Sequence, residues 1–216
     1  EEEGLLGSLG MLGQLTEDDL SRRMRSGSAG PTLRELLTGI GVDPAAVSSG
    51  KHCVDFAKIA AFIEVHIEQS ARLDNAVTDR VGVVTGIRGL IRHRTIQAIG
   101  ETAHAGAVDF PYRKDAALAC ARFSSRLYDF WQHELSLGRD LVATTGVIRT
   151  SPSASMNKIA GECIVSLDAR SLSAAELNLF EKKVEAILQE TAEETGVIFK
   201  TDPLMRIAPV EADEGV

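Results

Sequence analysis

Apolar residues recur every three or four positions in two long stretches of the chain. The apolar positions of residues 112–137 are Ala116, Cys120, Phe123, Leu127, Phe130, Trp131 and Leu135. Those of residues 173–196 are Leu177, Phe180, Val184, Ile187 and Leu188. This spacing places the apolar side chains on one face of a helix, so each stretch predicts a helix packed on a core. Gly138 and Gly196 are positioned to end the two helices.

Apolar and alternating runs predict strands around these helices. The runs cover residues 92–100, 141–149, 162–170 and 197–199. Together with the helices they follow the order β-α-β-β-α-β, which is the split βαβ arrangement of ferredoxin-like domains. The sequence therefore predicts a two-layer domain over about residues 87–202. This order says nothing about function, because the fold hosts many unrelated activities.

The residues before this domain indicate part of a separate α/β domain. Residues 59–67 are almost wholly apolar, which is typical of a strand in a sheet covered on both faces. Residues 81–88 predict a second strand, weakened by glycines. Thr32 and Glu35 have the spacing of a capping box, so a short helix is expected after Thr32. The predicted fold class is α/β.

Composition and charge remove several classes of protein. Of the 216 residues, 44% are hydrophobic, which is too many for a disordered chain, and the net charge is −8. An acidic surface repels phosphate, so no nucleic-acid partner is expected. No apolar run approaches the length of a membrane span, so no membrane partner is expected either. Three scattered cysteines argue against a disulfide framework and favour a reducing, cytoplasmic location.

Two groups of residues carry possible metal chemistry. Glu2 and Glu3 are adjacent carboxylates, of which one can bind a metal while the other takes a proton from metal-bound water. The alternative is a frayed acidic terminus. His66 alternates with Glu64 and Glu68, so a strand would place all three on one face as possible zinc ligands. The alternative is a solvated cluster on an edge strand.

Two further groups suit substrate contacts. His104 lies among small residues in the stretch from Thr102 to Gly106, where a ligand can come close. A turn histidine without function is the alternative. Arg170 has a planar fork that suits a carboxylate, and Asn157 can hydrogen-bond the same group. The alternative for Arg170 is a surface ion pair with Asp168, which contributes little.

The ordered motifs resemble one family over nearly the whole chain. The stretches concerned are Glu2-Glu3-Gly4, Phe62-Ile-Glu-Val-His-Ile-Glu-Gln69, Val81-Gly-Val-Val-Thr-Gly-Ile87, His104-Ala-Gly106 with Arg113-Lys-Asp-Ala116, and Asn157-Lys-Ile-Ala-Gly161 with Ser166-Leu-Asp-Ala-Arg170. They are similar to metal-dependent amidohydrolases that act on carbamoyl and ureido compounds. This group includes N-carbamoyl-L-amino-acid hydrolases, allantoate amidohydrolases and β-ureidopropionases, which are relatives of the dinuclear-zinc aminoacylases and peptidases.

The resemblance implies a catalytic α/β domain interrupted by a ferredoxin-like dimerisation domain. The parts would be a partial metal-binding domain at 1–86, the inserted domain at 87–202 and a return segment at 203–216. The substrate would be a small carbamoyl or ureido carboxylate, and the enzyme a homodimer. Two divalent metal ions per subunit are implied, usually zinc, with manganese, cobalt or nickel as other options.

The resemblance also implies a role for each candidate residue. Glu3 and His66 would be metal ligands, and Glu2 would be the general base. His104 would reach across the dimer and stabilise the oxyanion. The substrate carboxylate would be held by Asn157 and Arg170.

The family's remaining metal ligands are expected outside this chain. They comprise a His-x-Asp and a bridging Asp upstream of the double glutamate, and a last His downstream of the inserted domain. The first hypothesis is therefore the central part of a metal amidohydrolase that cleaves linear amide C–N bonds and is inactive by itself. The second is a non-catalytic remnant that dimerises and binds a carboxylate. A third, an unrelated ferredoxin-like binding domain, is disfavoured by the residues around His66 and His104.

Overall fold

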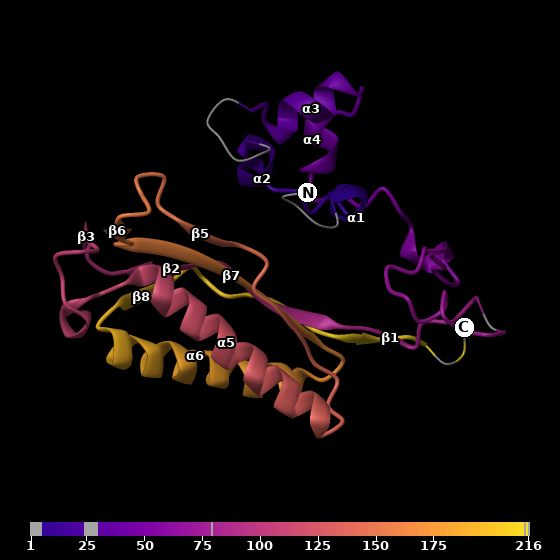
Figure 1. Cartoon of the computed structure of the whole chain (residues 1–216). Coiled ribbons are helices and arrows are strands. Elements are labelled where there is room, and N and C mark those ends of the chain that lie inside the picture. Colours follow the sequence, from indigo (N-terminus) through magenta and orange to yellow (C-terminus); the bar gives the residue numbers. More distant parts are fainter. Residues whose placement is uncertain (1–5, 24–29, 79, 214, 216) are drawn as a thin grey trace. The chain divides into compact units, whose positions relative to one another are not determined.

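The computed structural model describes residues 6–23, 30–78, 80–213 and 215. The chain divides into two compact units, of which the first ends at Gln69 and the second begins at Ser70. Each unit is described by itself (Figure 1). No helix in the described part of the chain is both long and apolar enough to cross a membrane.

The first unit contains short helices, of which those after the first begin at side-chain caps. They are α1 (Leu6–Met11), α2 (Glu17–Ser21), α3 (Leu33–Gly39), α4 (Pro44–Val47) and the 3-10 turn η1 (Phe56–Lys58). The hydroxyl of Thr32 accepts a hydrogen bond from the Glu35 amide, and the Glu35 carboxylate accepts one from the Thr32 amide. The capping box predicted at Thr32 is therefore confirmed. Leu15, Leu20 and Leu33 are buried within this unit.

The strand predicted over residues 59–67 is not formed. These residues carry no regular structure, and their side chains are exposed, with Val65 at 97%. An apolar run becomes a strand only where neighbouring strands supply hydrogen bonds and cover its faces. Within the described residues no strand pairs with this run. The strand predicted over residues 81–88 is likewise reduced to β1 (Gly86–Ile87), which pairs with β10 (Val210–Glu211).

The second unit is built on an antiparallel sheet. Its central strands are β2 (Gly89–Ile99) and β7 (Glu162–Ser171), and the strand order is β4-β7-β2-β8. The other strands are β4 (Val142–Thr144), β5 (Ile148–Thr150), β8 (Ile198–Thr201) and β9 (Met205–Ile207). The run predicted as one strand over 141–149 is thus two short strands, and both pair with β7.

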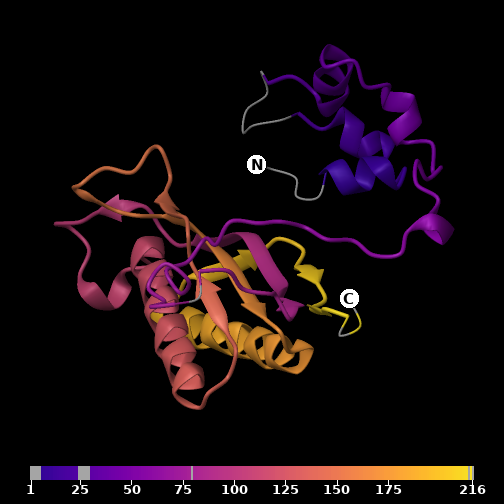
Figure 2. The same ribbon diagram turned by 90° about the vertical axis from the view of Figure 1, so that its right-hand side faces the viewer.

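Two long helices cover one face of this sheet. They are α5 (Ala116–Ser136) and α6 (Ala174–Thr195), which Figures 1 and 2 show side by side on the same face. Asp115 caps α5, Ser173 caps α6, and Gly196 ends α6 with a φ of +65°. The order β2-α5-β4-β7-α6-β8 is the β-α-β-β-α-β order predicted from the sequence. The domain boundaries at 86 and 202 stay a prediction.

Alternation along β7 separates the core from the outer face of the sheet. Four of its residues, Cys163, Val165, Leu167 and Ala169, are buried among Phe123, Leu127, Phe180 and Ile187 of the helices. The residues between them, Ile164, Ser166, Asp168 and Arg170, are partly or fully exposed. Since side chains alternate across a strand, Asp168 and Arg170 stand on the face that the helices leave uncovered.

A short antiparallel ladder between segments distant in sequence completes the second unit. This β3–β6 ladder pairs β3 (Ala103–His104) with β6 (Lys158–Ile159), and His104 lies opposite Lys158. The Gly100 amide donates to the Gly161 carbonyl at 2.8 Å, where β2 and β7 lead into the ladder. A Cβ on Gly161 would lie 2.3 Å from the Thr102 hydroxyl oxygen, so the close approach requires glycine.

Candidate functional site

The candidate residues are divided between the two units. His66 lies in the first unit, on the exposed segment that forms no strand, and its Nδ1 is 2.5 Å from the Ile67 carbonyl oxygen. His104, Asn157 and Arg170 lie in the second unit. Glu2 and Glu3 lie outside the described residues. Because 59–67 is not a strand, the alternation that placed Glu64, His66 and Glu68 on one strand face does not apply.

The β3–β6 ladder brings the backbones of His104 and Asn157 close to each other. The Ala105 amide, next to His104, donates to the Asn157 carbonyl at 2.9 Å. The Asn157 Oδ1 accepts a hydrogen bond from the Ser155 hydroxyl at 2.7 Å, which leaves the amide nitrogen of this side chain as a donor. Both side chains belong to exposed residues. The ladder therefore brings the backbones of His104 and Asn157 close together, with both residues at the surface.

The tautomer of the neutral His104 ring follows from one hydrogen bond. The Gly106 amide lies 3.1 Å from His104 Nδ1. A backbone N–H can only donate, so Nδ1 accepts and carries no proton. The proton of the neutral ring is then on Nε2, the nitrogen directed away from the loop backbone. His104 thus offers an N–H donor to a ligand.

Arg113 holds the loop that follows His104. Its Nε donates to the Val108 carbonyl at 2.8 Å, and its terminal nitrogen donates to the Ala105 carbonyl at 2.5 Å. Two residues later, Asp115 accepts from the amides of Ala117 and Leu118 and begins α5. Arg113 was part of the sequence motif but was given no role there. Its position makes it a positioning residue for the His104 loop.

Arg170 shares a carboxylate with a second arginine. Its Nε donates to Asp168 Oδ1 at 2.7 Å, and Arg92 of the neighbouring strand donates to Asp168 Oδ2. Burial raises the pKa of Asp168, but the hydrogen bonds from Arg170 and Arg92 outweigh burial, so the pKa lies below its usual range. The hydrogen bond to Asp168 raises the pKa of Arg170 further. The surface ion pair considered from the sequence is present, and Arg92 is the member that sequence reasoning missed.

Arg170 and the β3–β6 ladder lie at opposite ends of β7. Arg170 is eight residues beyond Glu162, where β7 begins next to the ladder. At about 3.3 Å per residue this is about 26 Å of strand. A small ligand bound to Arg170 therefore cannot also contact His104 and Asn157 of the same chain. Within one chain the structure therefore places Asn157 near His104 and separates it from Arg170, with which it was expected to hold the substrate carboxylate.

The described residues do not fit a resident catalytic metal. Within the part of the chain that the structure describes, no group of three or more His, Cys, Asp and Glu can hold a metal ion. A catalytic zinc site needs about three protein ligands and an open position. His66 alone does not meet this requirement.

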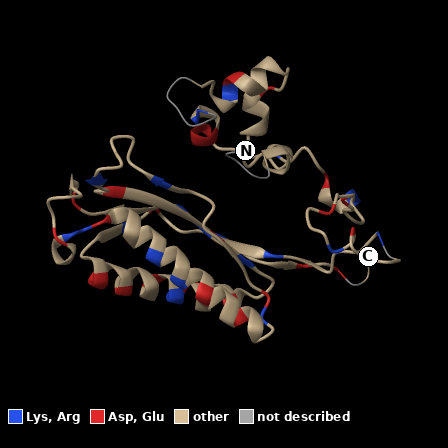
Figure 3. Cartoon of the chain, in the orientation of Figure 1, with Lys and Arg blue, Asp and Glu red and all other residues tan. Residues whose placement is uncertain are grey.

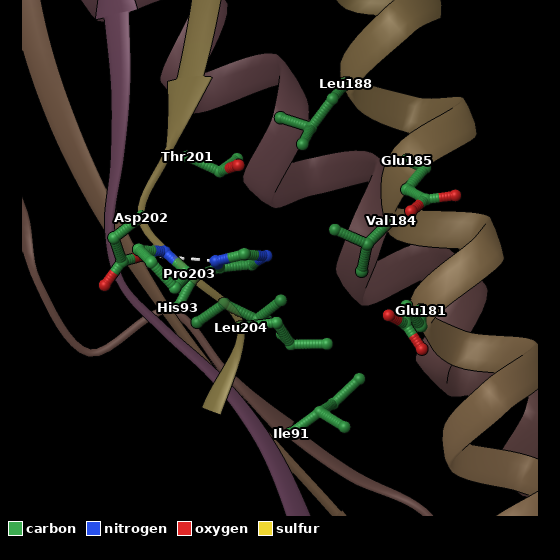
Figure 4. Close-up of a pocket in the computed structure, with 11 residues that line it drawn as sticks. Ile91, His93, Glu181, Val184, Glu185, Leu188, Thr201, Asp202, Pro203 and Leu204 are labelled. Carbon is green, nitrogen blue, oxygen red and sulfur yellow. Dashed lines mark hydrogen bonds and ion pairs between the residues drawn. The ribbon is translucent and has the colours of Figure 1, made fainter. Parts of the chain in front are cut away.

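A pocket of about 470 Å³ opens between the sheet and α6, away from the predicted residues (Figure 4). His93 of β2 faces it, and His93 Nδ1 lies 3.1 Å from Asp202 Oδ1. Ile91, Leu167 and Val184 form apolar walls, and Glu181 pairs with Arg206 at the rim. Sequence reasoning did not single out His93. Its partner Asp202 also accepts from the Arg94 amide, so the pair fastens the loop after β8 to β2.

Charged side chains are mixed over the second unit. Figure 3 shows acidic and basic residues on both α5 and α6, while the charged residues in the C-terminal half of α6 are all acidic, Glu185, Glu190, Glu193 and Glu194. Ion pairs such as Arg126 with Glu194 join the two helices. The expectation that nucleic acid is no partner stays a prediction.

Comparison with known proteins gives consistent relatives over the whole chain. N-carbamoyl-L-amino-acid amidohydrolase of Paenarthrobacter aurescens is 30% identical over 98% of this chain and 50% of its own length. Allantoate amidohydrolase of Bacillus subtilis (strain 168) is 31% identical over 99% of this chain and 50% of its own length. No family model matches the chain.

A solved structure has the same architecture. It is a hydantoinase/carbamoylase family amidase from Burkholderia ambifaria, with 28% identity and a TM-score of 0.69. The match covers 99% of this chain and 48% of that one. The chain thus spans about half the length of the curated relatives and of the solved structure that it matches.

Proposed function

Since the chain belongs to the family of N-carbamoyl-L-amino-acid and allantoate amidohydrolases, we propose that the protein hydrolyses linear amide C–N bonds of N-carbamoyl amino acids or related ureido compounds. The observation that carries this proposal within the structure is the contact of the Gly106 amide with His104 Nδ1. It leaves Nε2–H of the neutral ring as a donor at the surface. Such a donor suits a carbonyl oxygen on which negative charge develops.

His104 is proposed to stabilise the oxyanion of the tetrahedral intermediate. When water adds to the carbamoyl carbon, the carbonyl oxygen gains negative charge, and a preorganised N–H donor lowers the barrier. The preorganisation comes from the loop, because the Gly106 amide holds the ring and Arg113 holds the backbone that follows it. His104 need not change its protonation state in this role.

Arg170 is proposed to bind the substrate carboxylate. Asp168 takes the Nε edge of the guanidinium, and among the described residues no other side chain hydrogen-bonds Arg170. The two terminal nitrogens therefore offer a pair of N–H groups that match a carboxylate. The proposed role of Asn157 is to donate to the same substrate.

The separation along β7 supports a homodimeric site. Within one chain Arg170 and the β3–β6 ladder are about 26 Å of strand apart, at about 3.3 Å per residue. A carbamoyl amino acid is much shorter than this. We therefore propose that His104 and Asn157 of one subunit act on the substrate that is held by Arg170 of its partner.

A divalent metal ion is proposed for the complete site, with Glu3 and His66 as ligands and Glu2 as the general base. Bound zinc or manganese supplies an activated water for the attack. Of these three only His66 lies among the described residues, and no metal cluster is found there. Inactivity of the chain by itself and the domain boundaries at 86 and 202 belong to the same proposal.

The proposal is tested on the protein expressed from its complete coding sequence. Hydrolysis of an N-carbamoyl-L-amino acid is measured with and without added divalent metal. His104→Gln should lower kcat about 10²- to 10³-fold, as expected for one oxyanion donor. The matched control is His133→Gln, an exposed position on α5. Equal activity of His104→Gln and wild type would contradict the proposal.

A mixing experiment tests the dimeric site. His104→Gln and Arg170→Gln are each inactive in this proposal. Unfolded together and refolded at equal amounts, they should regain about a quarter of the wild-type activity, because half of the dimers are hybrids with one intact site of two. A mixture that stays inactive while it forms hybrid dimers would place His104 and Arg170 in the same subunit's site.

The second candidate is a non-catalytic dimer that binds a small carboxylate. It is favoured by the free guanidinium edge of Arg170, combined with the absence of a metal cluster from the described residues. Stoichiometric metal binding by the purified protein distinguishes the two. Tight binding of zinc supports the hydrolase, and a metal-free dimer that binds carboxylates supports the alternative.

A further inference from the structure

The neighbours of Arg170 on the outer sheet face are apolar. In the strand register, Arg170 of β7 lies opposite Val142 of β4 on one side and Leu90 of β2 on the other. Leu90 in turn lies opposite Ile207 of β9. Directly opposed residues of antiparallel strands point to the same face. The row Val142, Arg170, Leu90 and Ile207 therefore crosses four strands with one cation among three aliphatic side chains.

The adjacent row carries an acidic and a basic side chain and holds Arg170 in place. It consists of Thr144, Asp168, Arg92 and Met205, each two residues from its counterpart in the first row. Asp168 binds Arg170 Nε at 2.7 Å and a terminal nitrogen at 3.4 Å. Because Asp168 occupies one edge of the guanidinium, the opposite edge is left for an anion. The guanidinium is thus both oriented and available.

The first row is open to a ligand. The Arg170 side chain is 50% exposed, and Ile207 is 45% exposed. Leu90 and Val142 are half-buried. The opposite face of the sheet is filled by the core under α5 and α6. A ligand can therefore reach the row only from the uncovered face, where its carboxylate meets Arg170 and its remaining atoms lie against aliphatic side chains.

We infer that Val142, Leu90 and Ile207 make the Arg170 site selective for carboxylates that carry an aliphatic substituent on the α-carbon. This rests on the proposed function, since it names the substrate class of that same carboxylate site. The α-carbon lies one bond from the carboxylate, so its substituent is the first group to meet the row. Each methylene removed from water strengthens binding about fourfold.

A polar substituent is disfavoured by the same row. A second ureido group on the α-carbon brings N–H donors that Val142, Leu90 and Ile207 cannot accept. Donors taken from water without a partner weaken binding. The row therefore favours N-carbamoyl-leucine, -valine or -isoleucine over N-carbamoylglycine, and also over allantoate, whose α-carbon carries two ureido groups.

The inference is tested by titrating the full chain, without metal, with N-carbamoyl-L-leucine, N-carbamoylglycine and allantoate. Binding is followed by calorimetry and by the NMR signal of Arg170 Nε–H. The leucine compound is expected to bind at least tenfold more tightly than the glycine compound. Leu90→Gln should reduce this ratio to about two or less while the affinity for the glycine compound stays unchanged. Leu90→Ala provides a second variant if Leu90→Gln does not fold.

The controls separate this inference from the proposed function. Ile198→Gln, an exposed apolar position on β8, should leave the ratio unchanged. Arg170→Gln should abolish binding of all three compounds. The inference would be overturned if the leucine and glycine compounds bound with equal affinity and both depended on Arg170. That result would still support the carboxylate site. Absence of any Arg170-dependent binding would overturn both.

Discussion

The Gly106 amide donates to Nδ1 of His104 across 3.1 Å, within a loop of three residues. The contact determines which ring nitrogen of the neutral imidazole carries the proton, so a local backbone hydrogen bond decides what the side chain can offer to a ligand. It also explains the small residues around His104. A Cβ on Gly106 would lie 3.3 Å from Cε1 of the ring and 3.4 Å from Nδ1.

Gly106→Ala is expected to displace the His104 ring. The added methyl group is too close to Cε1, so the ring must turn and its hydrogen bond to the amide weakens. We expect about a tenfold loss of kcat, because small misplacements of a catalytic group cost this much or more. The melting temperature should change little, since the loop is exposed. Gly146→Ala is the control, and equal losses in both variants would contradict the argument.

Arg113→Lys is expected to loosen the same loop without removing its charge. A lysine cannot donate to the Val108 and Ala105 carbonyls in the fixed fork geometry of arginine. Loss of the two hydrogen bonds should destabilise the loop by about 1–3 kcal/mol. Hydrogen exchange of the amides of residues 105–108 should become faster. Arg122→Lys, in a surface ion pair with Glu194, should leave those amides unchanged.

Gly161→Ala is expected to destabilise the second unit. The new Cβ would lie 2.3 Å from the Thr102 hydroxyl oxygen and 2.7 Å from the Thr102 amide nitrogen. Overpacking of this kind costs about 1–3 kcal/mol of unfolding free energy. The double variant with Thr102→Ala should recover only part of the loss, because the backbone nitrogen remains. Urea unfolding measures both. Gly146→Ala, whose Cβ would meet Thr144 at an ordinary 3.7 Å, should be near wild type.

Asp168 should make stability depend on pH. Burial raises its pKa, but the hydrogen bonds from Arg170 and Arg92 lower it more, so the folded-state pKa lies below the unfolded value of about 4. A group of this kind stabilises the fold above its unfolded pKa, and the contribution is lost as the pH falls through the folded pKa. Asp168→Asn should therefore be less stable than wild type at pH 7.

The measured quantity is the difference in unfolding free energy between wild type and Asp168→Asn. Urea unfolding at a series of pH values should show it largest above pH 5 and shrinking as the pH falls below 4. Asp129→Asn, on the exposed side of α5, serves as the control for the removal of one carboxylate. A difference that stays constant down to pH 2 would show that Asp168 acts through packing and not through its charge.

Local patterns in the sequence were sufficient to predict the two long helices of the second unit. The apolar spacing of Phe123 and Leu127 in α5, and of Phe180 and Ile187 in α6, predicted helices that the structure contains. The stop at Gly196 was readable for the same reason, since it depends on residues within one turn. The start of α5 was misplaced by four residues, because Asp115 caps the helix and the residues before it follow a different path.

What the sequence by itself determined was the set of local elements, their order and the family to which the motifs belong. Only the tertiary structure decided that 59–67 is not a strand among the described residues, because an apolar run needs partners that its own composition does not supply. Only the strand register showed that Arg170 lies beside Val142 and Leu90, and far along β7 from His104. Register joins residues that are distant in sequence, so no local pattern encodes it.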